Sequence, residues 1–568
     1  MSTLAFIDRI NRKRLAGQTA FLLQFNTNDR YFDAEKNESP LPLRLAISAK
    51  FPNHDVGYYS QSTGMMSIMR PGDNNKSIFT INSNETPVDA VTRGIRALRE
   101  NEKSILIIDF TQFLIPNGTS DMLHPDTTRM IENMVRVSVD DELRKKDSFV
   151  IGISYTREIH ELVKQNWCII DLPLPDSADR MAYYKLLLGK NGFATLEDDI
   201  SEFEYSSLSK GARLRDIESV MRQAHGEARK VTREDLNAVR ETTLKALVGD
   251  LLVVRKPSSL TFDDIAGMES IKGFVKAIAA SIKAGKYGLA PAGILIVGPP
   301  GTGKTYVVDA IAQEFGGYQI LEWRNMKSMW LGKSEANIDS ALQAITANSP
   351  VLVAIDEADQ ILTGRQENSS TDGGTSGYMF GRLLSFMGDG QFKGKIVWVL
   401  TSNRPDLIDP ALADRIGACV PLLRPGRTSI PEIMRSLAKQ IDIPIEIDDN
   451  ELIKLANSLP QQVSVRKLKD LLGMSALHAS DDNVRVDDLR SALSDVLFNE
   501  DQLKIDYWTA LACRMATYAS LLPWRKGQNV IVDNIPDCLK GIVDSKTGDI
   551  NSSELDRKIR ELSRTVGI

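Results

Sequence analysis

The sequence predicts an α/β protein in which parallel sheets are sandwiched by helices and followed by a helical lid. Three observations predict this fold. Short apolar runs typical of buried strands alternate with amphipathic helical patterns through the first 250 residues and again from residue 294 to residue 400. A glycine-rich loop lies between a strand-like run and a helical pattern. From about residue 430 the pattern turns helical and stays mostly helical to the end of the chain.

In the first 250 residues each element follows from the spacing of its apolar side chains. Val88, Val91 and Ile95 fall on one face of a helix, whereas Ile-Leu-Ile-Ile-Asp-Phe at 105–110 is typical of a buried strand. We expect helices over 87–100, 129–141, 179–188, 209–226 and 233–248. We expect strands over 19–25, 43–50, 105–110, 149–154 and 167–172.

Later in the chain, strands are expected over 294–297, 351–355 and 396–400. A chain of 568 residues is too long for one core, and about 150 residues per domain gives three or four domains. The polar break at 255–259 is a plausible boundary, and residues 363–377, rich in Gly, Ser, Thr and Asp, are expected to form a mobile loop. The expected domains cover 1–250, 251–430, a helical lid at 431–500, and a C-terminal extension at 501–568 that is helical at first and then turn-rich.

Composition and charge argue against a general nucleic-acid binder. Hydrophobic residues make up 42% of the chain and charged residues 25%, as in ordinary globular proteins. The formal net charge is -6, whereas a protein that neutralises phosphates usually carries a basic excess. The clusters Arg12-Lys13-Arg14 and Arg144-Lys145-Lys146 are short and have no aromatic neighbours. We interpret them as solvated helix faces, so nucleic acid is not an expected partner.

The cysteines, the N-terminus and the length of the apolar runs indicate in which cellular compartment the protein works. Cys168, Cys419, Cys513 and Cys538 are far apart and form no CxxC pair, so neither a disulfide framework nor a zinc site is predicted. The N-terminus lacks the apolar core of a signal peptide, and no apolar run approaches the ~18–20 residues needed to cross a bilayer. We therefore expect a cytoplasmic protein with no membrane partner.

The glycine-rich loop predicts a phosphate-binding site. Gly298-Pro299-Pro300-Gly301-Thr302-Gly303-Lys304-Thr305 fits G-x-x-x-x-G-K-T, and it lies between a strand and a helix as that motif requires. Its backbone N–H groups and the following helix start can surround phosphate oxygens. Lys304 would then contact the β- and γ-phosphates, and Thr305 would bind Mg²⁺. With Tyr306 next in sequence, the loop predicts a site for ATP and Mg²⁺; a chance glycine turn is the weaker interpretation.

Two polar strand ends complete the predicted site. Asp356 and Glu357 follow the apolar run at 351–355, about 50 residues after the loop. Asp356 would hold the Mg²⁺ shell, and Glu357 would orient and deprotonate the attacking water. Asn403 follows the next strand and could hold the water or the γ-phosphate. Taken alone, the acids would be interpreted as a helix cap and Asn403 as a turn residue.

Three further segments accompany these motifs in order: Phe262-Asp263-Asp264-Ile265-Ala266-Gly267, Ser328-Met329-Trp330-Leu331-Gly332-Lys333-Ser334-Glu335, and Thr401-Ser402-Asn403-Arg404-Pro405-Asp406-Leu407-Ile408-Asp409-Pro410-Ala411-Leu412. Together with the loop and the acid pair, they resemble the AAA family of P-loop ATPases. The resemblance is close over about residues 260–425 and loose through the lid to about residue 500.

The resemblance implies a ring, usually a homo-hexamer, with ATP bound between subunits. Ile265, Ala266 and Gly267 would line the adenine pocket. Trp330 and Leu331 would lie in pore loop 1, as in the branch that includes katanin and the proteasomal ATPases, and Trp330 would grip a protein client. An alternative is that Trp330 packs in a core beside Met329.

The sequence departs from the family in its arginines. The family usually places Arg-Pro-Gly-Arg directly after Asp-Pro-Ala-Leu, whereas this chain has Ala413-Asp414-Arg415-Ile416. We therefore predict Arg415 as the arginine finger. The string Arg424-Pro425-Gly426-Arg427 occurs beyond a further strand and is out of register. Arg466 begins a lid helix and resembles a sensor-2 residue that would contact the γ-phosphate; a plain surface arginine is an equal alternative.

The N-terminal half resembles a degenerate AAA-like domain. Phe110 stands where the catalytic acid would follow Asp109, Lys210–Asp216 resembles the start of a lid helix, and no phosphate loop precedes them. This order of a loop-less half and an active domain resembles AAA proteins encoded in algal chloroplast genomes and in cyanobacteria.

These interpretations lead to one preferred function and two alternatives. The preferred function is a ring-forming, ATP-hydrolysing motor that remodels or threads a protein client. The first alternative is an ATP-switched assembly factor or nucleic-acid-associated ATPase of a phage-like or defence system. The second is a scaffold that binds ATP statically, which the intact Lys304, Asp356, Glu357 and Asn403 disfavour.

Overall fold

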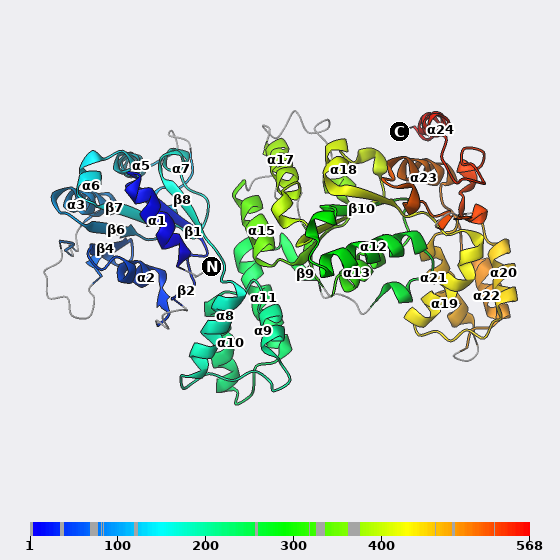
Figure 1. Ribbon diagram of the computed structural model, residues 1–568, viewed down its shortest axis with the longest axis horizontal. Coiled ribbons are helices and arrows are strands. Elements are labelled where there is room, and N and C mark those ends of the chain that lie inside the picture. Colours follow the sequence, from blue (N-terminus) through cyan, green and yellow to red (C-terminus); the bar gives the residue numbers. More distant parts are fainter. Residues whose placement is uncertain are drawn as a thin grey trace. The chain divides into compact units, whose positions relative to one another are not determined.

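A computed structural model describes residues 4–33, 39–68, 78–80, 82, 85–118, 123–255, 260–316, 318–324, 335–361, 375–460, 462–479, 483–526 and 529–567 (Figure 1). Its contacts divide the chain into two compact units. The first contains Met1–Gly249 and Ala336–Asn348, and the second contains Asp250–Glu335 and Ser349–Ile568. In the part that the structure describes, no helix combines the length and the apolar character needed to cross a membrane.

The first unit is built on a six-stranded sheet with the order β5-β4-β6-β7-β1-β8. In that order the strands are Gly64–Ser67, Asp55–Ser60, Ser104–Ile108, Phe149–Ile153, Ala20–Phe25 and Cys168–Leu172. All neighbours are parallel except β5 and β4, which pair antiparallel. The short antiparallel pair β2 (Arg30–Tyr31) and β3 (Leu41–Pro42) lies outside this sheet.

Helices cover both faces of this sheet. The alternation within β6 shows how: Leu106 and Ile108 join the core with α3, α5 and α7, whereas Ile105 and Ile107 join the core with α1 and α2. Every residue of β6 and β7 is buried, as expected of parallel strands between two helical layers. The helices are α1 Ala5–Leu15, α2 Leu43–Lys50, α3 Pro87–Glu100, α4 Thr111–Leu114, α5 Pro125–Ser138, α6 Asp141–Lys145 and α7 Glu161–Asn166.

One predicted strand was wrong. Residues 43–50 form the helix α2, in which Leu43, Ala46 and Ile47 are buried at helical spacing. The apolar residues Leu43, Leu45 and Ile47 also alternate, so this short segment fits both periods. Tertiary packing against the core decides between them.

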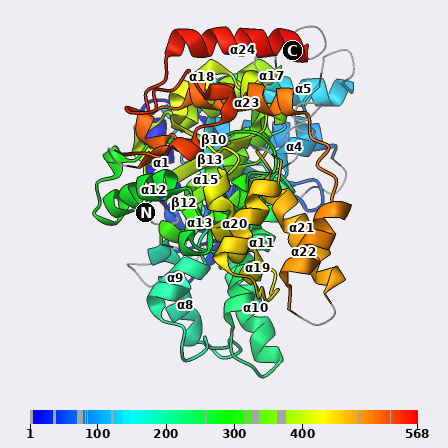
Figure 2. The same ribbon diagram turned by 90° about the vertical axis from the view of Figure 1, so that its right-hand side faces the viewer.

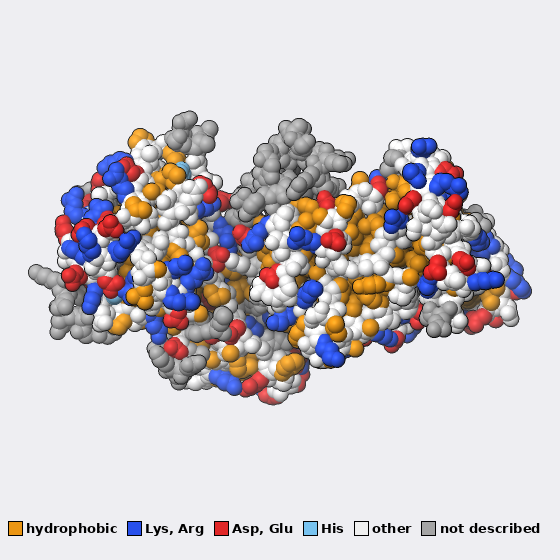
Figure 3. Space-filling model, turned by 45° about the horizontal axis from the view of Figure 1, so that its top comes forward, with side chains coloured by type: hydrophobic (Ala, Val, Ile, Leu, Met, Phe, Trp, Pro, Cys, Tyr) orange, Lys and Arg blue, Asp and Glu red, His pale blue; other side chains and the backbone are white. Residues whose placement is uncertain are grey.

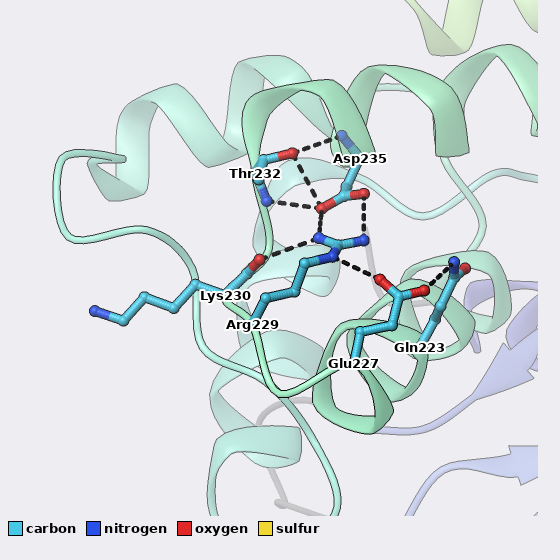
Figure 4. A network of polar contacts seen from close by, with 6 residues as sticks. All are labelled: Gln223, Glu227, Arg229, Lys230, Thr232 and Asp235. Carbon is cyan, nitrogen blue, oxygen red and sulfur yellow. Dashed lines mark hydrogen bonds and ion pairs between the residues drawn. The ribbon is translucent and has the colours of Figure 1, made fainter.

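Four helices complete the first unit: α8 Ser177–Leu188, α9 Glu202–Leu208, α10 Leu214–Gly226 and α11 Arg233–Val248. They share their own apolar core. Thr232 and Asp235 form a capping box at the start of α11, and Arg229 donates hydrogen bonds to Asp235 (2.5 and 3.1 Å) and to Glu227 (2.6 Å), as Figure 4 shows. The network fixes the turn between α10 and α11.

A short piece from the middle of the chain belongs to this unit. Residues Ala336–Asn348, most of helix α15 (Glu335–Ala347), group with the first unit, although they lie within the range predicted for another domain. The buried Arg240 donates to Asn348 Oδ1 (2.9 Å), Gln343 donates to Asp171 (2.5 Å), and Arg157 donates to Ser340 Oγ (3.0 Å).

The second unit contains a six-stranded sheet with the order β14-β10-β13-β12-β11-β9. In that order the strands are Gly417–Pro421, Gly293–Val297, Ile396–Ser402, Val351–Ile355, Gln319–Trp323 and Leu252–Arg255. β9 pairs antiparallel with β11, and the other neighbours are parallel. Each unit therefore has five parallel strands with one antiparallel strand at the edge. Its helices in this region are α12 Glu269–Lys283, α13 Lys304–Glu314, α16 Ala358–Ile361, α17 Thr375–Met387 and α18 Pro410–Ile416.

A four-helix lid follows, with its own apolar core. Its helices are α19 Ile430–Gln440, α20 Asp449–Ser458, α21 Val465–His478 and α22 Val486–Asp495. The α/β region and this lid confirm the predicted fold class.

The C-terminal extension begins with α23 (Gln502–Met515) and continues through turns and the hairpin β15 (Arg525–Lys526) and β16 (Asn529–Val530). The expectation of a turn-rich end was wrong for its last part, because α24 (Ser552–Val566) is a helix that packs beside α23 (Figures 1 and 2). Asn551 caps α24, and Leu555 and Leu562 are buried at a helical spacing of seven.

Candidate active site

The glycine-rich loop joins β10 to α13 at the carboxyl end of the sheet. Gly301 has φ +80° and Gly303 φ +91°, a region that favours glycine. Gly298 is required for a different reason, since an added Cβ would lie 2.0 Å from the carbonyl oxygen of Leu422. The loop therefore follows a path that only glycine allows, and it ends at the N-terminus of α13, where anions are favoured.

Lys304 lies buried within this loop. Its Nζ donates to the carbonyl oxygens of Gly298 (2.9 Å) and Pro299 (2.8 Å). Burial lowers the pKa of Lys304 to about 7, while the Asp356 carboxylate acts in the opposite direction. A phosphate in the loop would supply the missing negative charge and favour the protonated amine.

The predicted acids lie where β12 ends. Asp356 and Glu357 are both exposed, and Glu357 has φ +50°. Thr401 of the neighbouring strand β13 donates its hydroxyl to Asp356 Oδ1. The Glu357 N–H donates to Asp356 Oδ1 (3.1 Å) and to Thr401 Oγ1 (3.3 Å). Asn403 follows β13, and its N–H donates to Asp359 Oδ1 (3.3 Å).

The arrangement fits Mg²⁺. Thr305 and Asp356 both line a cavity of about 250 Å³, together with Arg255, Glu322 and Arg324. One carboxylate and one hydroxyl oxygen, completed by phosphate and water, form the kind of site that Mg²⁺ prefers. Thr305 and Asp356 would therefore hold the ion.

Two of the residues predicted to line the adenine pocket lie at a cavity near the glycine-rich loop. Ala266 and Gly267 line a second cavity, of about 240 Å³. Ile265 instead packs into the apolar core of the second unit and is only 8% exposed. Its side chain supports the segment rather than lining the cavity.

The three arginines occupy different environments. The N–H of Arg466 donates to the carbonyl of Gly301 (3.2 Å), so the lid helix α21 meets the loop, and the Arg466 side chain is exposed. Arg415 is exposed near the end of α18 and donates to the carbonyl of Leu384 (3.1 Å). Arg424 is buried and pairs with Glu500 (2.6 Å), so it serves the interior.

Three predicted features lie wholly or partly outside the described residues: the pore-loop residues Trp330 and Leu331, residues 256–259 of the polar break, and residues 363–374 of the expected mobile loop. No role was predicted for Thr401 or Asp359, which position the acid pair and Asn403. The sequence indicates these roles only weakly, because Thr401 can be linked to Asp356 only once β12 and β13 are known to be neighbouring strands.

The first unit shows a similar backbone at the equivalent strand end. Phe110 follows Asp109 at the end of β6 with φ +53°, and its N–H donates to Asp109 Oδ1 (2.9 Å), as Glu357 does to Asp356. Tyr58 donates to Asp109 (2.7 Å). A partly exposed aromatic ring thus stands where the second unit has a carboxylate.

The loop after β1 also differs. Asp29 comes four residues after β1, as Gly301 comes four residues after β10. Its carboxylate accepts hydrogen bonds from the backbone N–H groups of Arg30 (2.8 Å) and Arg215 (3.0 Å) and from Asn26 Nδ2 (3.0 Å). Burial raises the pKa of Asp29 to about 6. In the first unit, the Asp29 carboxylate therefore accepts hydrogen bonds from backbone N–H groups at the position that corresponds to Gly301.

Comparisons with known proteins agree with the geometry of the second unit. Residues 294–422 match the family model described as "ATPase family associated with various cellular activities (AAA)". Protein CdcH of Halobacterium salinarum is 25% identical over 379 residues, which are 59% of this chain and 50% of that protein. The chain thus spans about half the length of this curated relative. The glycine loop, the acid pair and Asn403 all fall within 294–422, the residues that are similar to the AAA ATPase family.

Proposed function

We propose that this chain is an ATP-hydrolysing AAA motor that forms a ring and remodels or threads a protein client. The observation that carries the proposal is the acid pair at the end of β12. Thr401 holds Asp356 beside the cavity that Thr305 lines, and Glu357 stands next to it in an exposed position.

The residues divide the work of hydrolysis. Lys304 and the loop N–H groups bind the phosphates. Thr305 and Asp356 would hold Mg²⁺, which would supply positive charge beside the phosphate oxygens. Glu357 takes a proton from the attacking water. Asn403, oriented through Asp359, holds that water or the γ-phosphate.

A ring, with a homo-hexamer as the specific proposal, is supported by the surface of the second unit. Leu289 is 71% exposed, and Tyr287 and Tyr518 are also exposed. Figure 3 shows hydrophobic side chains gathered on the second unit around the part that α12 and α18 occupy. Such surfaces mark association sites. Arg415 is exposed and would act on ATP bound to a neighbouring subunit.

The client proposal rests on Trp330 and Leu331 in a segment that resembles pore loop 1. A large ring can grip an extended chain without reading its sequence. We place this activity in the cytoplasm, with no nucleic acid required.

We also propose that the first unit is an AAA-like domain that does not hydrolyse ATP, as in the chloroplast-encoded and cyanobacterial proteins. Its strand order matches that of the second unit, and Asp29 and Phe110 occupy the positions of a loop glycine and the catalytic acid. Its role would be to bind a partner or to brace the ring.

The test is ATP turnover per chain measured over a wide range of protein concentration, with Glu357→Gln as the inactive control. We expect turnover to rise steeply, because subunits complete one another's sites. Measurable turnover per chain that stays constant at every protein concentration would contradict the ring. If Glu357→Gln turned over ATP as fast as the wild type, Glu357 would not be the general base.

A further inference from the structure

The cavity of about 240 Å³ beside the glycine loop is lined by four stretches of the second unit. Two belong to the AAA domain and its approach, namely 266–271 and 421–426. The lid contributes Ile433 and Val465 among others. The fourth stretch belongs to the C-terminal extension and contributes Pro523, Arg525, Ile531 and Asn534.

The cavity adjoins the phosphate loop on two sides. Leu422, which lines it, donates its N–H to the carbonyl of Val297 (2.8 Å), directly before the loop. Val465, which also lines it, precedes Arg466, whose N–H contacts Gly301. A nucleotide with its phosphates in the loop would place its base in this cavity.

The extension is fixed to the body of the second unit. Leu521 is fully buried in the same apolar core as Phe262 and Ile271. Trp524 is also fully buried, and its Nε1 donates to the carbonyl of Gly548 (3.0 Å). Thr517 accepts a hydrogen bond from the N–H of Cys419 in β14 (2.8 Å). Leu521 and Thr517 therefore attach the extension to the unit whose cavity it lines.

The lining suits a flat heterocycle that carries an amino group. Ile271, Ile433 and Ile531 supply apolar surface, which is typical of small-ligand sites. Asn534 Nδ2 donates to the carbonyl of Pro523 (3.2 Å), so the amide is oriented. Its Oδ1 is buried and has no hydrogen-bond partner in the described structure. Buried acceptors of this kind normally have a donor.

We propose that the C-terminal extension completes the base pocket, and that Asn534 accepts a hydrogen bond from the exocyclic amino group of adenine. The inference rests on the ATP-binding function proposed above and deepens it. It assigns base selection to a segment outside the AAA-family match, which ends at residue 422.

The first test compares the binding of ADP and IDP by calorimetry, because IDP carries an oxo group in place of the amino group. We expect the wild type to prefer ADP and Asn534→Ala to bind ADP about three- to tenfold more weakly, with IDP little changed. Asn529→Ala, an exposed amide of the same extension outside the cavity, serves as control. An unchanged ratio of ADP to IDP affinity in Asn534→Ala would overturn the role of Asn534.

The second test fills the cavity. Ile531→Trp should weaken ADP binding at least tenfold and leave the binding of inorganic tripolyphosphate unchanged, since that anion needs only the loop. Val532→Trp changes the next residue, which is 48% exposed and outside the cavity, and should change neither. Normal ADP binding by Ile531→Trp would overturn the base pocket. Failure of the wild type to bind ADP or tripolyphosphate would instead refute the proposed function.

Discussion

Thr401 shows how one hydroxyl can organise a site. Asp356 is exposed, so water competes for its carboxylate, yet the Thr401 hydroxyl and the Glu357 N–H both donate to Oδ1. Thr401 itself is only 3% exposed and cannot turn away. The orientation of the acid pair therefore depends on a buried residue of the neighbouring strand.

Replacing Thr401 with Val keeps the shape of the side chain and removes the hydroxyl. We expect the kcat for ATP to fall about 10- to 100-fold, the usual effect of losing a group that orients a metal ligand. The Mg²⁺ concentration for half-maximal turnover should rise as well. Turnover measured against Mg²⁺ tests this, with Ser402→Ala as control because Ser402 Oγ accepts from Arg404 instead. Unchanged Mg²⁺ dependence would contradict the assignment.

At this scale the sequence identifies residues whose motif has fixed spacing. The glycine loop, Asp356 and Glu357 are predicted because the phosphate and the ion dictate their order along one chain. Thr401 and Asp359 are not, because each acts on a residue from another strand or segment, and Asn534 is not, because only the fold places it beside the cavity. Only the fold brings these groups together.

Among the elements, the contact between the β1 loop and α10 is the most informative. Asp29 accepts from the N–H of Arg215, the second residue of α10, much as Gly301 accepts from Arg466, the second residue of α21. In the first unit this contact places a carboxylate among backbone donors in a buried site. Neither the loop nor the helix predicts it alone.

Asp29 should make the first unit less stable as pH rises. Its folded pKa of about 6 lies above the ordinary 3.8, so the native state binds more protons than the unfolded state between these values. Stability is therefore greatest below the lower value and is lost as pH rises through about 6. The loss is about 3 kcal/mol, because each pKa unit corresponds to about 1.4 kcal/mol.

Asp29→Asn should remove this dependence, so that its stability relative to the wild type increases between pH 4 and pH 7. Urea unfolding followed by the ¹⁹F signal of fluorotryptophan at Trp167, buried in the first unit, measures it. Asp33→Asn, four residues away, controls for the loss of a charge. Parallel pH profiles for Asp29→Asn and wild type would refute the role of Asp29.

The elements themselves are predicted where periodicity is long or unambiguous. The helices at 87–100 and 233–248 and the strand at 351–355 have the predicted bounds. The error at 43–50 arises because eight residues satisfy two periods, and α24 lies in the part of the C-terminal extension that was expected to be turn-rich. An ambiguous period, rather than the length of the segment, accounts for the error at 43–50.

For the whole molecule, the two sheets share one strand order, and the spacing of residues along the sequence could not predict this order. Single motifs suggest a disabled half, but order and direction come only from pairing between distant strands. If only the second unit hydrolyses ATP, as proposed, its site would need an arginine from a neighbouring subunit, and Arg415 is the predicted residue.

ATP turnover by a mixture of two inactive variants tests whether Arg415 acts on the site of a neighbouring subunit. Arg415→Ala keeps the acid pair, and Glu357→Gln keeps the finger. In a ring that exchanges subunits, about a quarter of the interfaces would pair an intact acid with an intact finger. We therefore expect the mixture to recover a substantial part of that fraction of wild-type turnover.

The control mixes Arg415→Ala with the double variant Arg415→Ala/Glu357→Gln, which supplies no finger and should recover nothing. Mixed assemblies that form without any recovered turnover would show that Arg415 does not act across the interface.

The membership of residues 336–348 in the first unit has a consequence during synthesis. The ribosome completes the first 249 residues, then 86 residues of the second unit, and only then the segment 336–348, whose Asn348 accepts a hydrogen bond from the buried Arg240. At about 5–20 residues per second, the first unit waits several seconds for its last piece. A gene fragment that stops at residue 250 would therefore encode a first unit that lacks residues 336–348. The surface that these residues cover would be exposed, and chaperones and proteases would recognise it.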